Sequence, residues 1–312
     1  MDNTDVLEET RKMNIPNFFI IGAPKCGTTA LSAYLWEHPN VFISEPNEPY
    51  YFDTDFSHTK KRDLGEYLSL FSKADPILQK AIGEASVSYL FSNCAANEIL
   101  HFNPNSKFIV MLRNPVDLVH SLHSERVFNG VENILDFETA WRTEAERKNG
   151  KKIPFSCFDK KELMYSEWGM LGDQVQRLFG SIKREKIKVI IFDDFIVDTR
   201  KIYEEVLDFL NINSDGRILF PKINESKRIV WPQLQQLFAY LYPKVTSIKK
   251  SLGFTKGWFG INRKLLTLNS KTALKSSISS SLRSELMTFY RDDVLKLSKL
   301  LERDLSCWVY PK

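Results

Sequence analysis

The sequence predicts an α/β fold in which helices flank a mostly parallel sheet within a single domain. Apolar runs typical of buried strands alternate with segments of helical spacing, and no internal repeat or break in composition marks a domain boundary. The 312 residues are enough to bury a substantial core. Hydrophobic residues make up 43% and charged residues 26%, which excludes a collagen-like, low-complexity or wholly disordered chain. We expect a polar tail over residues 1–15 and the domain over residues 16–312.

The strands are expected where short apolar runs end in a loop. They span residues 17–21, 41–43, 81–84, 107–112 and 187–192. The first, Asn17-Phe-Phe-Ile-Ile21, leads into a Gly-rich loop, and the fourth ends at Arg113. Runs that are apolar at consecutive positions indicate strands buried on both faces, as parallel sheets require.

The helices are expected where apolar residues recur every three or four positions. After the Gly-rich loop, Leu31, Tyr34 and Leu35 follow at this spacing. Further helices are predicted over residues 60–75, 115–128, 136–148, 162–179, 199–211 and 279–301. Pro115 suits the first turn of its helix, and Gly180 is the expected C-cap of the helix that precedes it.

Charge and cysteine usage narrow the function classes. With 43 basic and 39 acidic residues the net charge is +4, which suits small anions and argues against nucleic acid as a partner. The cysteines are widely spaced, with no C-x-x-C pair, so neither a disulfide framework nor a zinc site is expected: Cys26, Cys94, Cys157 and Cys307. The N-terminus MDNTDVLEETRK is polar and acidic, unlike a signal peptide, and no apolar run approaches the ~18 residues of a membrane span. These features predict a soluble protein of the reducing cytoplasm.

The loop from Gly22 to Thr29 has the chemistry of a phosphate-binding loop. Backbone N–H groups of such a loop, and the N-terminus of the helix after it, point at the anion. Gly22 and Gly27 have the spacing of the nucleoside triphosphatase P-loop, but Thr28 follows where that loop has lysine. The lysine, Lys25, instead lies inside the loop. The loop is therefore P-loop-like but brings its cation to the phosphate from another direction.

The end of the strand at 107–112 argues against a magnesium site. A Mg²⁺-dependent nucleotide site needs an Asp at the end of a neighbouring strand, and Arg113 stands there instead. Two positive charges without a metal ligand suit an anionic nucleotide handled without metal. Two alternatives stay open at this point, a Mg²⁺-dependent nucleotide kinase or NTPase and a non-catalytic nucleotide-binding module.

Two motifs resemble the cofactor-binding elements of sulfotransferases that use 3′-phosphoadenosine 5′-phosphosulfate (PAPS). The stretch Phe18-Phe-Ile-Ile-Gly-Ala-Pro-Lys-Cys-Gly-Thr-Thr-Ala-Leu31 resembles their 5′-phosphosulfate loop, and Met111-Leu-Arg-Asn-Pro-Val-Asp-Leu-Val-His-Ser121 resembles their 3′-phosphate element. The tail Leu300-Leu-Glu-Arg-Asp-Leu-Ser-Cys-Trp308 resembles the end of bacterial members and of the heparan-sulfate type. The resemblance covers residues from about 17 to 308 and implies the sulfotransferase fold, with PAPS as co-substrate, PAP as product and no metal.

The resemblance also implies a role for each motif residue. Those assigned to the cofactor are Lys25, Cys26, Gly27, Thr28, Thr29, Arg113 and Ser121, the first five around the 5′-phosphate. Lys25 would donate to the bridging oxygen as negative charge builds there, which makes it catalytic as well. Arg113 and Ser121 would hold the 3′-phosphate. Cys26 contributes through its backbone amide, because nothing in the sequence supplies a base to make its thiol a nucleophile.

A general base is expected on the acceptor side, because the acceptor must lose a proton. The segment Ser44-Glu-Pro-Asn-Glu-Pro-Tyr-Tyr-Phe52 resembles the family's K-E-P-x-x-F segment, which places Glu48 at the position of the proposed base. Asn47 stands where the family commonly has lysine. Glu84 and one of the five histidines remain as alternatives, although His38, His120 and His123 are more readily explained as capping or packing residues.

The acceptor is expected to be a small molecule with a reactive hydroxyl or amine. The 44–55 loop carries four acids and no Lys or Arg: Glu45, Glu48, Asp53 and Asp55. Such a loop would repel an anionic glycan, so the hypothesis is a neutral or cationic natural product; the alternative is that only Glu48 faces the pocket. Tyr50, Tyr51 and Phe52 would wall the pocket or belong to the core.

A second charge asymmetry lies between residues 244 and 275, which hold eight basic residues and no acid. This segment is interpreted as a lid that covers the cofactor, as a contact surface or as a solvated basic face.

Overall fold

The computed structural model describes two compact units of the chain. It describes residues 14–57, 63–223, 227–229, 236–237, 240–241, 270–272 and 277–310, and for 227–229 and 270–272 the backbone only. The first unit holds residues 14–55, 63–113 and 172–223, and the second holds 56–57, 114–171 and the described residues beyond 223. The single domain expected over residues 16–312 stays a prediction.

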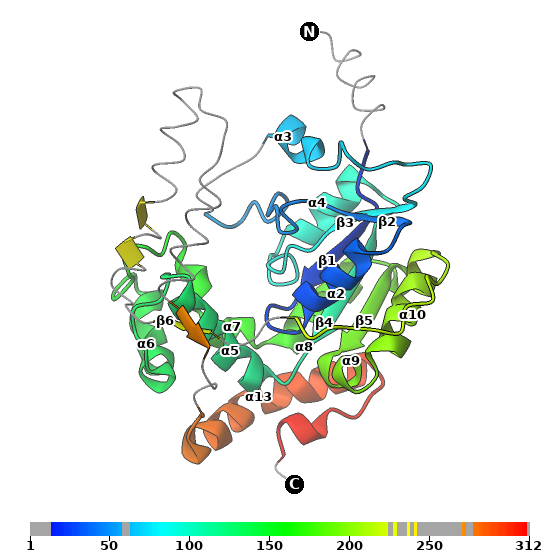
Figure 1. Cartoon of the computed structure of the whole chain (residues 1–312). Helices are drawn as coiled ribbons and strands as arrows, with labels where there is room; N and C mark the ends of the chain where they lie inside the picture. Colours follow the sequence, from blue (N-terminus) through cyan, green and yellow to red (C-terminus); the bar gives the residue numbers. More distant parts are fainter. Residues whose placement is uncertain are drawn as a thin grey trace. The chain divides into compact units, whose positions relative to one another are not determined.

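A five-stranded parallel sheet forms the centre of the first unit (Figure 1). Its strands are β1 (Phe18–Gly22), β2 (Val41–Ile43), β3 (Ala81–Glu84), β4 (Lys107–Leu112) and β5 (Ile187–Ile191). Their order across the sheet is β2-β3-β1-β4-β5. This confirms the α/β fold predicted from the alternation of apolar runs and helical segments. Because all five strands run the same way, the segments that follow them meet at one edge.

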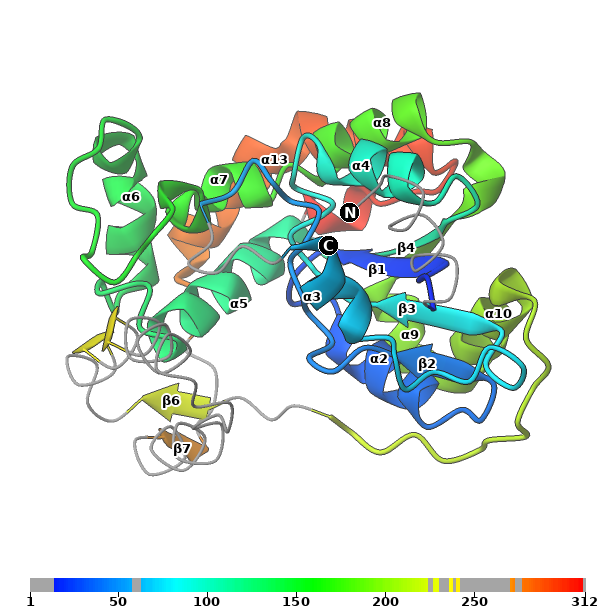
Figure 2. The same cartoon turned by 90° about the horizontal axis from the view of Figure 1, so that it is seen from above.

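Helices cover both faces of this sheet, which explains why its strands are apolar at consecutive positions. Figure 2 shows α4 and α8 on one face, with α2, α9 and α10 on the other. Their bounds are α2 (Thr28–Trp36), α4 (Ala95–Phe102), α8 (Leu171–Ser181), α9 (Phe192–Val197) and α10 (Thr199–Leu210). The side chains of Phe18–Ile21 in β1 and of 108–112 in β4 are fully buried between these layers. Right-handed crossovers place α2 opposite α4, because the chain moves in opposite directions across the sheet after β1 and after β3.

Several sequence predictions need correction. The helix expected over 162–179 is broken into a 3₁₀ turn (Lys160–Leu163), α7 (Tyr165–Trp168) and α8. Gly169 lies at the break, and the ring of Tyr290 occupies the place where a Cβ on it would stand. Gly180 lies inside the last turn of α8 and is not its C-cap. The short helix α3 (Leu64–Ser69) is all that the structure describes of the one expected at 60–75, and α4 and α9 were not predicted.

The second unit is mainly helical. It contains α5 (Pro115–Phe128), α6 (Phe137–Lys148), α7, α13 (Ser280–Leu300) and an antiparallel pair of strands, β6 (Lys227–Ile229) and β7 (Ser270–Thr272). Pro115 stands in the first turn of α5, as predicted. Arg147 of α6 makes two 2.7 Å hydrogen bonds to Glu132, and both side chains are fully buried. Tyr165 also donates to Glu132, at 2.8 Å. None of the described helices is long and apolar enough to cross a membrane.

Candidate active site

The loop between β1 and α2 is shaped by its backbone. The amide of Ala23 donates to the carbonyl of Met111 in the neighbouring strand β4, at 2.7 Å. Gly27 ends the loop with φ of +92°, in the left-handed region that glycine adopts at no steric cost. A Cβ on Gly27 would lie 3.1 Å from ring carbons of Phe192. The loop therefore needs glycine at this position for both its conformation and its packing.

The helix that follows the loop presents groups that are suited to bind a phosphate. Gly27 is the N-cap of α2, and no side chain caps this end of the helix in the described part of the chain. The amides of the first turn and the helix dipole both favour an anion here. Thr28 is nearly buried and Thr29 is exposed, so the two hydroxyls lie at different depths. The local geometry fits the predicted 5′-phosphate cradle.

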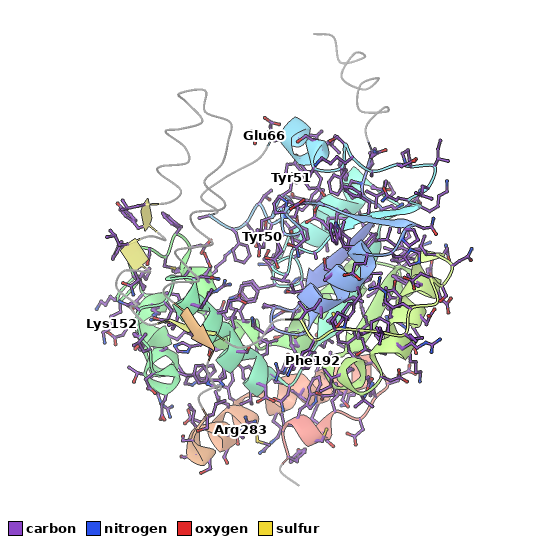
Figure 3. The ribbon with its side chains drawn as sticks, in the orientation of Figure 1. Tyr50, Tyr51, Glu66, Lys152, Phe192 and Arg283 are labelled. Carbon is purple, nitrogen blue, oxygen red and sulfur yellow. The ribbon has the colours of Figure 1, made fainter. Side chains whose placement is uncertain are left out.

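Arg113, directly after β4, lies against this loop. Its Nη1 donates to the carbonyl oxygen of Lys25 at 3.3 Å, and its guanidinium lies 4.8 Å from the centre of the Phe192 ring at the start of α9 (Figure 3). Lys25 and Arg113, 88 residues apart in sequence, thus meet at the carboxyl edge of the sheet. Phe192, which sequence reasoning missed, orders this corner by contact with both the loop and the arginine.

Cys26 is a packed loop residue. It is fully buried, and its thiol donates to the carbonyl of Pro24 at 3.4 Å. Burial raises the pKa of the Cys26 thiol well above its usual range, although Arg113 and Lys25 act in the opposite direction. A thiol held protonated in this way is a poor nucleophile, in keeping with the expectation from sequence.

Ser121 belongs to the second unit, unlike Arg113. It lies in α5 and is 8% exposed. Its expected pairing with Arg113 on one phosphate stays a prediction. Residues 244–275, where the basic segment was noted, lie outside the described residues apart from the backbone of β7.

The segment that carries Glu48 follows β2 and is attached to β3 and the loop after it. The amide of Ser44 donates to the carbonyl of Gly83 at 3.0 Å, and the amide of Ala85 donates to the carbonyl of Asn47 at 2.7 Å. Glu48 is half-buried, and its Oε2 accepts a hydrogen bond from the hydroxyl of Tyr50. The segment thereby joins the same sheet edge as the loop after β1.

Glu84, the alternative base, is enclosed at the end of β3. It is fully buried and accepts hydrogen bonds from three hydroxyls, those of Ser86 at 2.5 Å, Tyr67 at 2.6 Å and Tyr89 at 3.2 Å. Burial raises the pKa of Glu84 to about 7, against the lowering effect of these hydrogen bonds. Glu84 has no exposed surface at which an acceptor could approach, whereas Glu48 is half-buried, so the geometry favours Glu48 as base.

Two of the four acids in the 44–55 loop are engaged in internal hydrogen bonds. Asp53 is buried and accepts from the hydroxyl of Ser88. Asp55 accepts from the hydroxyl of Ser92 at 2.5 Å and from the amide of Asn93 at 3.2 Å. Hydrogen bonds from neutral groups do not cancel a negative charge, so the repulsion expected of this loop still comes from all four acids, of which Glu45 is exposed.

Three of the described histidines behave as packing residues, whereas His101 is exposed in the last turn of α4. Nδ1 of His38 accepts from the amide of Asn40 at 3.0 Å, and its Nε2 lies 3.1 Å from the carbonyl of Asn213, so it closes the end of α2 as predicted. The rings of His120 and His123 pack against Phe137, and burial lowers the pKa of His123. His58 lies outside the described residues. In the part of the chain that is described, no three His, Cys, Asp or Glu side chains gather to hold a metal ion.

Comparison with known proteins identifies the family. The model of the family described as "Sulfotransferase domain" matches residues 16–279. Human carbohydrate sulfotransferase 15 is 32% identical over 148 residues, which cover 34% of this chain and 26% of that protein. The human bifunctional heparan sulfate N-deacetylase/N-sulfotransferase 3 is 23% identical over 293 residues, 93% of this chain and 30% of that protein. The chain thus spans less than a third of the length of these curated relatives.

A solved structure extends the likeness to the fold. The crystal structure of a sulfotransferase from Alicyclobacillus acidocaldarius is 27% identical, with a TM-score of 0.66 over 95% of this chain and 100% of that one. The sequence resemblance and the fold prediction are therefore confirmed. With the family model covering most of its length, the chain belongs to the sulfotransferase domain family.

Proposed function

We propose that this protein transfers a sulfuryl group from PAPS to a hydroxyl or amine of a small acceptor and releases PAP. The observation that carries the proposal is the meeting of Lys25 and Arg113 at the glycine-ended loop before α2, in a chain of the sulfotransferase domain family. PAPS, when bound, supplies the sulfuryl group and a phosphate as leaving group. The N-terminus of α2, which no described side chain caps, suits that phosphate.

Different residues of the chain bind the two phosphates and stabilise the charge that develops during transfer. The amides of Cys26 and Gly27 and the hydroxyls of Thr28 and Thr29 hold the 5′-phosphate. Lys25 places a positive charge where negative charge develops on the leaving oxygen, which lowers the barrier without a metal ion. Arg113 and Ser121 bind the 3′-phosphate, which distinguishes PAPS from nucleotides that lack it.

Glu48 accepts the proton that the acceptor loses. Its carboxylate is half-buried and oriented by the Tyr50 hydroxyl, whereas Glu84 is fully enclosed. Retention of full turnover by Glu48→Gln would contradict this role, while loss of turnover with unchanged PAP binding supports it.

For the acceptor we propose a neutral or cationic small natural product, consistent with the exposed Glu45 and with Glu48. The names of the relatives, carbohydrate sulfotransferase 15 and heparan sulfate N-sulfotransferase, favour a carbohydrate as second candidate. A panel of neutral sugars, amino alcohols, phenols and anionic oligosaccharides, assayed with PAPS, separates the two. Sulfation of anionic oligosaccharides alone would overturn the first candidate. A cytoplasmic location stays a prediction.

The decisive experiment on the cofactor compares thermal stabilisation by PAP, 5′-AMP and ATP, with and without Mg²⁺. A ligand at ~100 times its Kd stabilises the native state by roughly 2.7 kcal/mol, a readily measured shift. We expect PAP to stabilise without metal and AMP to do little, because AMP lacks the 3′-phosphate. Stabilisation only by ATP with Mg²⁺ would instead support the kinase or NTPase alternative. PAP binding without any transfer across the acceptor panel would support the non-catalytic module.

A further inference from the structure

Resting on the proposed function, we propose that Glu84 is the positioning residue for the base Glu48. It orients the hydroxyls of Ser86 and Tyr89, and these two hydroxyls hold the backbone of the segment on which Glu48 lies. The buried carboxyl thus acts on the acceptor side of the site without touching the acceptor. We call Glu84, Ser86 and Tyr89 the latch.

Each latch hydroxyl bridges Glu84 to the backbone of the Glu48 segment. The Ser86 hydroxyl donates to Glu84 Oε2 at 2.5 Å and accepts from the amide of Tyr50 at 3.0 Å. The Tyr89 hydroxyl donates to Glu84 Oε1 at 3.2 Å and accepts from the amides of Tyr51 at 2.8 Å and Phe52 at 3.2 Å. Three consecutive amides, at residues 50–52, are therefore bound by two side chains that share one carboxyl.

Glu84 sets the direction in which the Ser86 and Tyr89 hydroxyls donate and accept. A hydroxyl has a single proton, and when that proton is donated to a carboxylate its lone pairs are left to accept from elsewhere. An ionised carboxylate only accepts, so it fixes the direction of both bridges at once. An amide in its place would present N–H groups to at least one hydroxyl and would reverse or break that bridge.

The latched backbone continues directly to Glu48. Tyr50 has a left-handed φ of +52°, and its own hydroxyl donates to the Glu48 carboxylate. On the other side of Glu48, the Ala85 amide, next to Glu84 in sequence, binds the carbonyl of Asn47 at 2.7 Å. Glu48 therefore lies between two attachment points that both lead back to the loop after β3. Figure 3 labels Tyr50 and its neighbour Tyr51 on this segment.

Tyr67 provides a matched control within the same network. Its hydroxyl donates to Glu84 Oε1 at 2.6 Å and its side chain is as fully buried as that of Tyr89. Its ring stacks on Tyr51 with centroids 4.3 Å apart, a contact that phenylalanine preserves. The amides of residues 50–52 donate to the hydroxyls of Ser86 and Tyr89 and not to that of Tyr67. Comparing Tyr67→Phe with Tyr89→Phe thus separates two effects. The first variant loses only a buried hydrogen bond to Glu84, whereas the second also loses the latch.

The test measures kcat, the acceptor KM and the PAP Kd at pH 8, where Glu84 is mostly ionised. We expect Glu84→Gln to lower kcat by about 10- to 100-fold, the scale of a misplaced catalytic group, while PAP Kd changes less than about twofold. Tyr89→Phe should lower kcat by a similar factor. Tyr67→Phe should lower the melting temperature but shift kcat much less than Tyr89→Phe.

A double-mutant cycle then asks whether Glu84 acts through Glu48. If it does, Glu84→Gln combined with Glu48→Gln has the same kcat as Glu48→Gln alone, because a misplaced base and a missing base are equivalent. Additive losses, equal effects of Tyr67→Phe and Tyr89→Phe, or a parallel loss of PAP affinity would each overturn the inference. Should Glu84→Gln fail to fold, the Tyr67 and Tyr89 variants combined with Glu48→Gln carry the same comparison.

These outcomes separate the inference from the proposed function. Wild-type protein that neither binds PAP nor transfers sulfate would overturn the function itself. Full turnover by Glu48→Gln would overturn the choice of base and, with it, the latch. A wild type that transfers, an inactive Glu48→Gln and an active Glu84→Gln would overturn the latch alone.

Discussion

The two sides of the candidate site are built in different ways, although both lie at the carboxyl edge of one sheet. The loop between β1 and α2 takes its shape from the backbone, through the φ of Gly27 and the hydrogen bond from Ala23 to Met111. The segment after β2 takes its shape from side chains, because Ser86 and Tyr89 bind its amides. In the first region the backbone holds the site together, whereas in the second region side chains do.

This difference decides how each region responds to substitution. In the loop between β1 and α2, the candidate cofactor loop, replacing a side chain should remove an interaction with the ligand and leave the loop in place. In the acceptor-side segment, replacing a buried hydroxyl or carboxyl should move the backbone on which the base lies. The predictions below test that contrast, beginning with the largest effect.

Lys25→Ala should lower turnover by roughly 10²–10³-fold, the usual cost of losing one preorganised group that stabilises developing charge. The protein should keep its melting temperature, because the Lys25 side chain is half-buried and the loop backbone is held by other contacts. The measurement is PAP release from PAPS at saturating acceptor. A large fall in melting temperature would contradict the idea that backbone, rather than side chains, shapes this loop.

Arg113→Ala should weaken PAP binding by about 10- to 100-fold, because hydrogen bonds to charged groups contribute about 1.5–3 kcal/mol. Calorimetric titration with PAP measures the change. Arg142→Ala is the control, since Arg142 is half exposed and pairs with Glu285 far from the loop in sequence. An equal loss of affinity in both variants would indicate general electrostatic attraction in place of a specific phosphate contact.

Gly27→Ala should disturb the loop itself, because the loop conformation depends on the backbone of this residue. A residue other than glycine in the left-handed region costs roughly 1–2 kcal/mol, and here its Cβ would also press on Phe192. Both stability and PAP affinity should fall. Gly150→Ala is a matched control, because Gly150 has a φ of +75° with no atom within 4 Å of an added Cβ. Gly150→Ala should lose stability but keep its PAP affinity. Equal PAP affinity in Gly27→Ala and Gly150→Ala would contradict the prediction.

The same contrast explains what sequence reasoning could predict. The cofactor loop is local, and Gly22, Lys25 and Gly27 stand within six consecutive positions, so a motif predicted it. The buried strands were predicted for the same reason, since their apolar runs are continuous. The latch joins Glu84, Ser86 and Tyr89 to amides more than 30 residues earlier in the chain, and no local pattern specifies that pairing. The break at Gly169 likewise depends on Tyr290, over 100 residues later.

The last prediction concerns the pH dependence of stability and again involves Glu84. Burial raises its pKa from 4.5 to about 7 in the folded protein, so between these pH values the native state holds a proton that the unfolded chain releases. The stabilising contribution of protonated Glu84, about 3 kcal/mol, is therefore complete below about pH 4.5 and is lost as pH rises from there through about 7. Its neighbours Tyr67 and Tyr89 have raised pKa values and stay protonated throughout, and Asp53 is the nearby acid that opposes ionisation.

Urea unfolding of the wild type and of Glu84→Gln at pH 5, 6, 7 and 8 isolates this contribution, because every other titrating group is common to both proteins. The difference in unfolding free energy, Gln variant minus wild type, should increase from pH 5 to about pH 7 and level off at pH 8. The kinetic effect of the latch has the opposite sign, since only the ionised carboxyl directs both hydroxyls toward the backbone. Wild-type kcat should thus rise over the pH range in which wild-type stability falls. If the pH dependence of kcat and that of stability both persist in Glu84→Gln, a group other than Glu84 titrates. If stability and kcat respond as expected, ionisation of Glu84 lowers stability while it positions the base, whereas the loop between β1 and α2, held by its backbone, has no such dependence.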